Sequence, residues 1–208
     1  YENIPVLSYV FLKGKCSSCK TKISIQYPLI ELLMGFIAFF LAPKSLSFEH
    51  LTQFVYYFSI MSVFVAHIAI DLEHHLLLDK LNVYLLCIIT PFSILNYPIE
   101  HWLVGGLIGF FGPLFVSVLF LKLRKQEGLG GGDIKLFGVL GIILGPVGIF
   151  NNMFMSCTLG AIIGLVLIMT SKMNKNSAFA FGPYIIIVAM AQIFFPGLVE
   201  QINPFLKF

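Results

Sequence analysis

The sequence predicts an all-α, polytopic membrane protein, a helical bundle of about seven transmembrane helices with a short N-terminal segment outside the lipid. Hydrophobic residues make up 58% of the 208 residues and charged residues only 11%, whereas soluble domains carry about a quarter charged residues. Each apolar run approaches the roughly 20 residues that cross a hydrocarbon core of about 30 Å. Because lipid cannot pair with backbone N–H and C=O groups, these runs are expected to be helices.

Lysines and arginines gather in alternate loops of this arrangement. If the N-terminus lies inside, 11 of the 13 lysines and arginines face the cytoplasm, and only Lys44 and Lys207 lie outside. Basic residues in short loops set the orientation of membrane proteins. The predicted cytoplasmic segments are 1–25, 72–80, 123–133 and 172–178. The basic residues are thus explained by contact with the lipid bilayer, and no nucleic-acid partner is expected.

The chain opens with a polar, basic segment, residues 1–25, and continues as a transmembrane domain, residues 26–208. Cys16 and Cys19 are spaced as half of a tetrahedral zinc site, because two intervening residues let a tight turn direct both thiolates at one ion. The alternative is a pair of reduced, unligated thiols. Since the chain starts at Tyr1 and lacks a charged-then-apolar segment at its front, we expect an upstream portion. A second CxxC pair in that portion would decide between the two interpretations.

Seven apolar runs follow. In the first, Glu31 lies within the first turn, where the helix dipole favours a negative charge, and both a structural and a functional role are open for it. Pro91 is expected to kink the third run, and Gly145-Pro146 to turn the chain after the fifth. Pro183 suits the start of the last run, because its missing N–H would be unpaired there anyway. The runs are 28–43, 51–71, 81–97, 102–122, 134–146, 148–171 and 181–195.

Two acids lie at cytoplasmic helix ends. Asp71 ends the second run, and Asp133 follows the glycines Gly130, Gly131 and Gly132, with Lys135 after it. No Gly-Lys-Ser/Thr follows the glycines, which excludes a phosphate-binding loop. Because glycine lets another chain approach closely, the stretch is expected to present Asp133 at the surface to an approaching substrate. An acid at a membrane-helix entrance is a functional candidate when it has a partner; the alternative is a solvated boundary charge.

Asp71 is the partner expected for Asp133. Of two carboxyl groups that approach closely, one keeps its proton while the other is ionised. Such a pair holds a base that activates water and an acid that protonates a leaving amine, so peptide hydrolysis needs no cofactor. His67 precedes Asp71 by four residues and shares its helical face. It is either a hydrogen-bond partner of the acid or substrate, or an interhelical polar contact without a chemical role.

The two acid regions resemble the signature regions of the bacterial prepilin peptidases, or type IV leader peptidases, which are membrane aspartic proteases of the GxGD kind. The first region is Asp71-Leu72-Glu73-His74 with Asp79, and the second is Gly130-Gly131-Gly132-Asp133-Ile134-Lys135. Further similar segments occupy 3–9, 14–19, 27–31 and 181–183, in the family's order. The resemblance therefore covers most of the chain.

The resemblance implies cleavage of short, basic leader peptides from type IV prepilins or pseudopilins at the cytoplasmic face of the bacterial inner membrane. Asp71 and Asp133 would be the catalytic acids. Cys16 and Cys19 would be the second of two CxxC pairs that hold zinc in many members. In many members the same protein methylates the new N-terminus with S-adenosylmethionine, and Glu31 is assigned either to methylation or to structure.

Two features depart from the family, and two other functions stay open. Leu78 stands where members have Pro before the position of Asp79, and the first CxxC and first membrane helix do not precede Tyr1. A transporter with broken helices would hold acids near the bilayer midplane, whereas these acids are predicted at the surface. A non-enzymatic membrane assembly subunit would keep its function when both acids are replaced.

Overall fold

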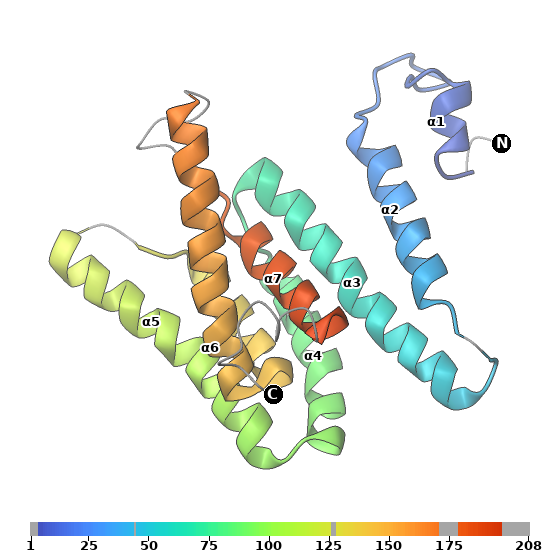
Figure 1. The fold of residues 1–208 in the computed structure, drawn as a ribbon. Helices are drawn as coiled ribbons and strands as arrows, with labels where there is room; N and C mark the ends of the chain where they lie inside the picture. The colour runs from blue at the N-terminus through green and yellow to red at the C-terminus, as the bar shows by residue number, and fades with distance from the viewer. Residues whose placement is uncertain (1–3, 44, 126–127, 171–178, 197–208) are drawn as a thin grey trace. The chain divides into compact units, whose positions relative to one another are not determined.

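The computed structural model describes residues 4–43, 45–125, 128–170 and 179–196 (Figure 1). These residues form helices joined by short connections, with an isolated antiparallel bridge between Lys15 and Lys22 and no strand. The all-helical prediction is therefore confirmed for the described residues. The predicted segment 172–178, Lys44 and Lys207 lie outside them.

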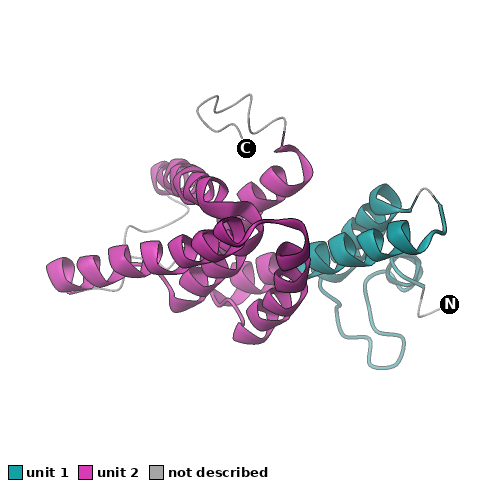
Figure 2. Cartoon of the chain, turned by 90° about the horizontal axis from the view of Figure 1, so that it is seen from below, with its two compact units in different colours: residues 1–65 teal, residues 66–208 magenta. Residues whose placement is uncertain are grey.

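The chain forms two compact units, residues 1–65 and 66–208 (Figure 2). The first contains α1 (Leu7–Phe11), α2 (Gln26–Leu41) and the first part of α3 (Phe48–His74). The second contains the end of α3, then α4 (Asp79–Asn96), the π-helical η1 (Glu100–Val104), α5 (Gly105–Arg124), α6 (Gly131–Met169) and α7 (Gly182–Phe194).

Two predicted boundaries are corrected by the structure. Helix α2 begins at Gln26 with Pro28 in its first turn, where the missing N–H of proline costs no hydrogen bond; Glu31 therefore lies in the second turn, not the first. Helix α3 runs past Asp71 to His74, so the connection to α4 is shorter than predicted. That helix ends where His75 adopts φ 53° and donates its N–H to the Asp71 carbonyl at 2.9 Å, as in a left-handed C-terminal cap.

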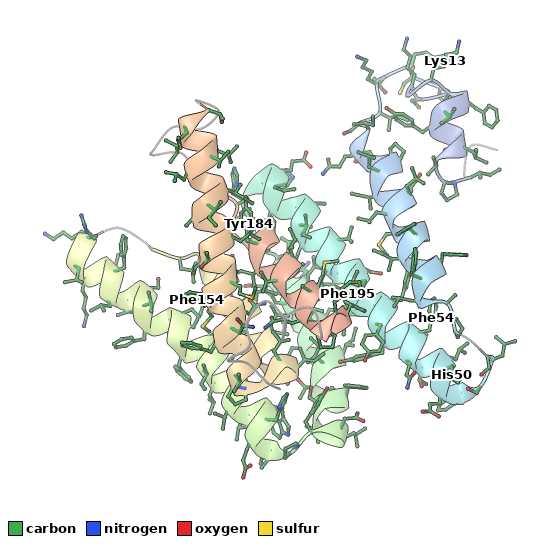
Figure 3. All side chains as sticks on the ribbon, in the orientation of Figure 1. Lys13, His50, Phe54, Phe154, Tyr184 and Phe195 are labelled. Atoms are coloured by element: carbon green, nitrogen blue, oxygen red, sulfur yellow. The ribbon has the colours of Figure 1, made fainter. Side chains whose placement is uncertain are left out.

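Three helical segments among the described residues are long and apolar enough to cross a membrane: Phe48–His74, Glu100–Arg124 and Gly131–Met169. Helices α2 and α7 are apolar but shorter. Large apolar side chains point outward on these helices, among them Phe154, which is 64% exposed and is labelled in Figure 3. Such a surface is unstable in water and suits lipid. The chain is a multi-pass membrane protein.

Helix α6 is the centre of the second unit, because α4, η1, α5 and α7 all pack on it. Its backbone breaks at Gly145, which has φ 70° and ψ 179°, at the place predicted for the turn. The His101 ring lies where a Cβ of residue 145 would be, so no larger residue fits. Gly105 of α5 and Gly141 of α6 bring two backbones into direct contact, the close packing that small residues allow between membrane helices.

Candidate active site

Asp71 lies in the last turn of α3 and is held by the start of α7. The backbone N–H of Gly182 donates to Asp71 Oδ2 at 2.9 Å. A Cβ on residue 182 would lie 2.7 Å from the same oxygen, so the contact requires glycine. Asp71 is only 5% exposed. Asp71 is therefore buried within the protein beside the start of α7, and its place at the cytoplasmic membrane surface stays a prediction.

Asp133 lies in the first turn of α6 and is partly buried. It interacts electrostatically with Asp71, so the second unit brings together two acids that are distant in the sequence. The backbone of Gly130 lies against the same carboxyl group, since a Cβ there would be 3.0 Å from Asp133 Oδ2. One side of the pair is thus built by the end of α3 and the other by the entrance of α6.

The glycines before Asp133 differ in what surrounds them. A Cβ on Gly132 would lie 2.8 Å from the Cβ of Leu77, and Leu77 also packs against Gly182. A Cβ added to Gly131 would have no other atom within 4 Å. The α3–α4 connection therefore fills the space beside Gly132, and Gly131 borders open space. A role of this stretch in substrate approach stays a prediction.

Lys135, predicted beside the substrate, forms an ion pair within the chain. Its Nζ lies 2.7 and 2.8 Å from the two carboxylate oxygens of Asp79. The two side chains are 49% and 65% exposed. The pair links the starts of α4 and α6 at a solvated surface, where such pairs contribute about 0–1 kcal/mol.

His67 of α3 and Asn82 of α4 are buried polar residues that interact with each other. His67 is completely buried and Asn82 is 3% exposed. Their side chains interact with each other, but neither ring nitrogen and neither amide atom has a partner at hydrogen-bonding distance and angle. The sequence indicates His67 through its spacing from Asp71, whereas Asn82 is one of several polar residues in α4 and gives no comparable signal.

Cys16 and Cys19 lie in the first unit, in a tight turn. The N–H of Cys16 donates to the Thr21 carbonyl at 2.9 Å, and the N–H of Lys20 to the Cys16 carbonyl at 3.1 Å. A hydrogen bond with the Thr21 hydroxyl at 2.8 Å lowers the pKa of Cys19 to about 7. The described residues contain no group of three or more potential metal ligands. Two thiolates supply half of a zinc site, so these residues alone do not support a zinc ion.

Glu31 has a structural partner. The backbone N–H of Val6 donates to Glu31 Oε2 at 2.7 Å, and Val6 has φ 62°, a strained conformation for a β-branched residue. Glu31 therefore fixes the residue that precedes α1.

The fold and the site together define a multi-pass helical membrane protein with two interacting acids at neighbouring helix ends. Two protein-family models match separate parts of the chain. Residues 1–45 match the bacterial peptidase A24 N-terminal domain, and residues 56–165, which include both acids, match the type IV leader peptidase family. The chain belongs to the type IV leader peptidase family, which confirms the resemblance drawn from the sequence.

Curated relatives support the same assignment. The chain is 32% identical to a prepilin leader peptidase/N-methyltransferase of Stutzerimonas stutzeri, over 90% of the chain and 64% of the relative. A protein of the same name from Xanthomonas campestris is 32% identical over 100% of the chain and 71% of the relative. A protein of that name from Bacillus subtilis is 30% identical over 88% of the chain and 72% of the relative. The chain thus spans less than two thirds of the Stutzerimonas stutzeri relative. No solved structure matches the chain.

Proposed function

We propose that the chain is the peptidase part of a membrane aspartic endopeptidase that removes the short basic leader from type IV prepilins or pseudopilins. The observation that carries this proposal is the placement of Asp71 and Asp133 at neighbouring helix ends, where Leu77 packs against both Gly182, which bonds to Asp71, and Gly132, which precedes Asp133. The family match over both acids and the names of the relatives support the substrate class. The proposed location is the bacterial inner membrane, with about seven spans and both acids toward the cytoplasm.

The proposed reaction uses the two carboxyl groups as base and acid. The ionised carboxylate takes a proton from water while the water oxygen bonds to the peptide carbonyl carbon. The other carboxyl group gives its proton to the leaving amine nitrogen as the C–N bond breaks. The products are a carboxylic acid on the leader and a free amine on the mature protein. The Gly182 N–H orients Asp71 for this step by holding Oδ2.

Methylation of the new N-terminus with S-adenosylmethionine is the second proposed activity, because the names of the relatives include N-methyltransferase. The contact of Glu31 with Val6 favours a structural role for Glu31. Zinc is proposed only for a longer protein in which a second pair of thiolates completes the four ligands. Transfer of a labelled methyl group to the cleaved N-terminus tests methylation directly.

The proteolytic proposal is tested by replacing each acid in the full protein. Asp71→Asn and Asp133→Asn each remove one half of the pair, so each is expected to abolish loss of the leader from a prepilin substrate, followed by mass. Glu73→Gln, an exposed acid on the same turn of α3, is the matched control and should cleave normally. If Asp133→Asn, expressed and inserted, cleaves at the wild-type rate, the proposal fails and the transporter hypothesis becomes the better one.

A further inference from the structure

Two buried polar side chains, one on α3 a turn before Asp71 and one in the first turn of α4, complete no hydrogen bond. His67 is completely buried with both ring nitrogens unpaired, and Asn82 is 3% exposed with both amide atoms unpaired. Buried polar groups are nearly always bonded to protein or to ordered water. In lipid no bulk solvent compensates for the loss. Four unpaired atoms on two neighbouring residues therefore indicate a polar ligand between them.

The position of this pair relates it to the acid. His67 lies one helical turn before Asp71, so the two side chains are neighbours on one face of α3. Side chains on a helix tilt toward its N-terminus, which directs the Asp71 carboxyl group over the turn that carries His67. A small molecule bonded to the imidazole is thus within reach of the carboxyl group.

An open cavity reaches one residue of the pair, Asn82. Asn82 lines an open cavity of about 490 Å³ between α4, η1, α5 and α6. Asp79 and Lys135 line the same cavity and are the exposed ion pair at the starts of α4 and α6. The rest of the lining is apolar except for the indole nitrogen of Trp102. The cavity therefore reaches Asn82, the residue that interacts with His67.

We propose that His67 and Asn82 bind the water molecule that is consumed in peptide hydrolysis and hold it beside Asp71. A buried water needs two to four polar partners, and the imidazole and the amide supply both donors and acceptors. The water oxygen bonds to the peptide carbonyl carbon and gives one proton to the ionised acid, while the protonated acid supplies the proton for the leaving amine. This inference rests on the proposed function and adds the residues that position the water.

Kinetics of the full protein with a prepilin-type substrate test the inference. His67→Phe and Asn82→Leu keep the volume and remove the polar atoms, so kcat should fall at least about tenfold with KM changed less than about twofold. His67→Gln, which keeps a donor and an acceptor, should recover most of the rate. Asn151→Leu, which removes another buried and unpaired amide, is the control and should leave kcat unchanged.

Thermal unfolding in detergent and an experimental structure separate this role from a structural one. The inference requires His67→Phe and Asn82→Leu to unfold at or above the wild-type temperature, and a water within about 3.2 Å of both side chains. A direct bond between His67 and Asn82 without water, or wild-type kcat in both variants, would overturn it. The proposed function fails separately, if the Asp71→Asn and Asp133→Asn proteins still cleave.

Discussion

The backbone N–H of Gly182 donates to Asp71 Oδ2 at 2.9 Å, across 111 positions of sequence. This hydrogen bond fixes one oxygen of a buried acid to the first residue of α7. In the proposed reaction, the other oxygen of Asp71 is left for Asp133 and the substrate. The start of α7 is therefore part of the site, and it contributes through a backbone N–H.

Gly182→Ala is expected to lower kcat for leader cleavage by about 10- to 100-fold, because displacing a reacting group by about 1 Å costs on the order of 100-fold. The added Cβ would lie 2.7 Å from Asp71 Oδ2 and 3.0 Å from Leu77, so the acid or the backbone must move. Steady-state cleavage of a prepilin substrate measures the effect. Gly35→Ala, which meets no atom within 4 Å, should cleave as wild type. Equal rates for the two variants would contradict the positioning role of Gly182.

The ion pair of Asp79 with Lys135 is predicted to contribute little to the free energy of unfolding. Both side chains are about half-exposed or more, so the coupling energy in a double-mutant cycle of Asp79→Asn and Lys135→Gln should be below about 1 kcal/mol. Thermal unfolding in detergent at low and high salt measures this coupling energy. High salt screens the two charges and should reduce the coupling energy further.

Cleavage kinetics of the same two variants separate a structural from a substrate-binding role for Lys135. If Lys135 serves only the ion pair, both variants should cleave within about threefold of wild type, a change below about 1 kcal/mol. A rise in KM for Lys135→Gln but not for Asp79→Asn would instead assign Lys135 to the substrate, as the sequence pattern suggests.

The helical class and the existence of each apolar segment follow from composition and run length, since an apolar run in lipid has few options other than a helix. The break at Gly145 was predictable for a local reason, the Gly-Pro pair. The end of α3 was not, because charged residues after Asp71 favour a loop locally, whereas the cap at His75 extends the helix by one turn.

The site was predicted only in part. Charge and position identify Asp71 and Asp133, because an acid is rare in an apolar sequence. The bond from Gly182 is made by a backbone N–H, which no side-chain pattern encodes, and it depends on how α7 packs. Asn82 and the pairing of Lys135 with Asp79 likewise depend on which helix faces meet, and a single sequence does not determine that.

Two adjacent asparagines in α6 allow a test of how polar groups stabilise this membrane protein. Asn152 donates to Gln192 Oε1 of α7 at 2.9 Å, and Gln192 donates to the Gly148 carbonyl at 2.8 Å. Asn151 is equally buried but neither of its amide atoms is bonded. Asn152→Leu should destabilise the fold by about 1–2 kcal/mol, whereas Asn151→Leu should cost less, because it removes no hydrogen bond within the protein.

Thermal or denaturant unfolding in one detergent measures both variants. Gln192→Leu should resemble Asn152→Leu, and combining the two should cost less than the sum, because they remove the same bond. Equal destabilisation by Asn151→Leu and Asn152→Leu would mean that Asn151 has a polar partner of its own.

Glu31 gives a prediction for the first unit. Glu31→Ala removes the acceptor of the Val6 N–H, so hydrogen–deuterium exchange of the segment before and within α1 should speed up by about tenfold or more. Glu31→Gln keeps an acceptor oxygen and should retain most of the protection. Methyl transfer to the mature N-terminus, measured on the same variants, distinguishes the roles: loss of transfer in Glu31→Gln with full protection of α1 would assign Glu31 to methylation.

The pH dependence of cleavage follows from the pairing of two acids. The proposed reaction needs one carboxylate and one protonated carboxyl group at the same time, so kcat/KM should fall on both sides of an optimum. Each limb should approach a tenfold change per pH unit, and the two apparent pKa values belong to the pair and not to Asp71 or Asp133 alone.

A substrate without titrating groups near the cleavage site, assayed between about pH 4 and about pH 9, reports the free enzyme's groups. Glu73→Gln and Asp79→Asn remove exposed acids outside the pair, so both should keep the wild-type profile with its two limbs. Gly182→Ala removes space beside Asp71 and should shift the profile as well as lower it, because the Gly182 N–H interacts with the charge on Asp71. A profile that is flat across this range, or that has one limb in the wild type, would show that cleavage does not depend on an acid and a base from the pair.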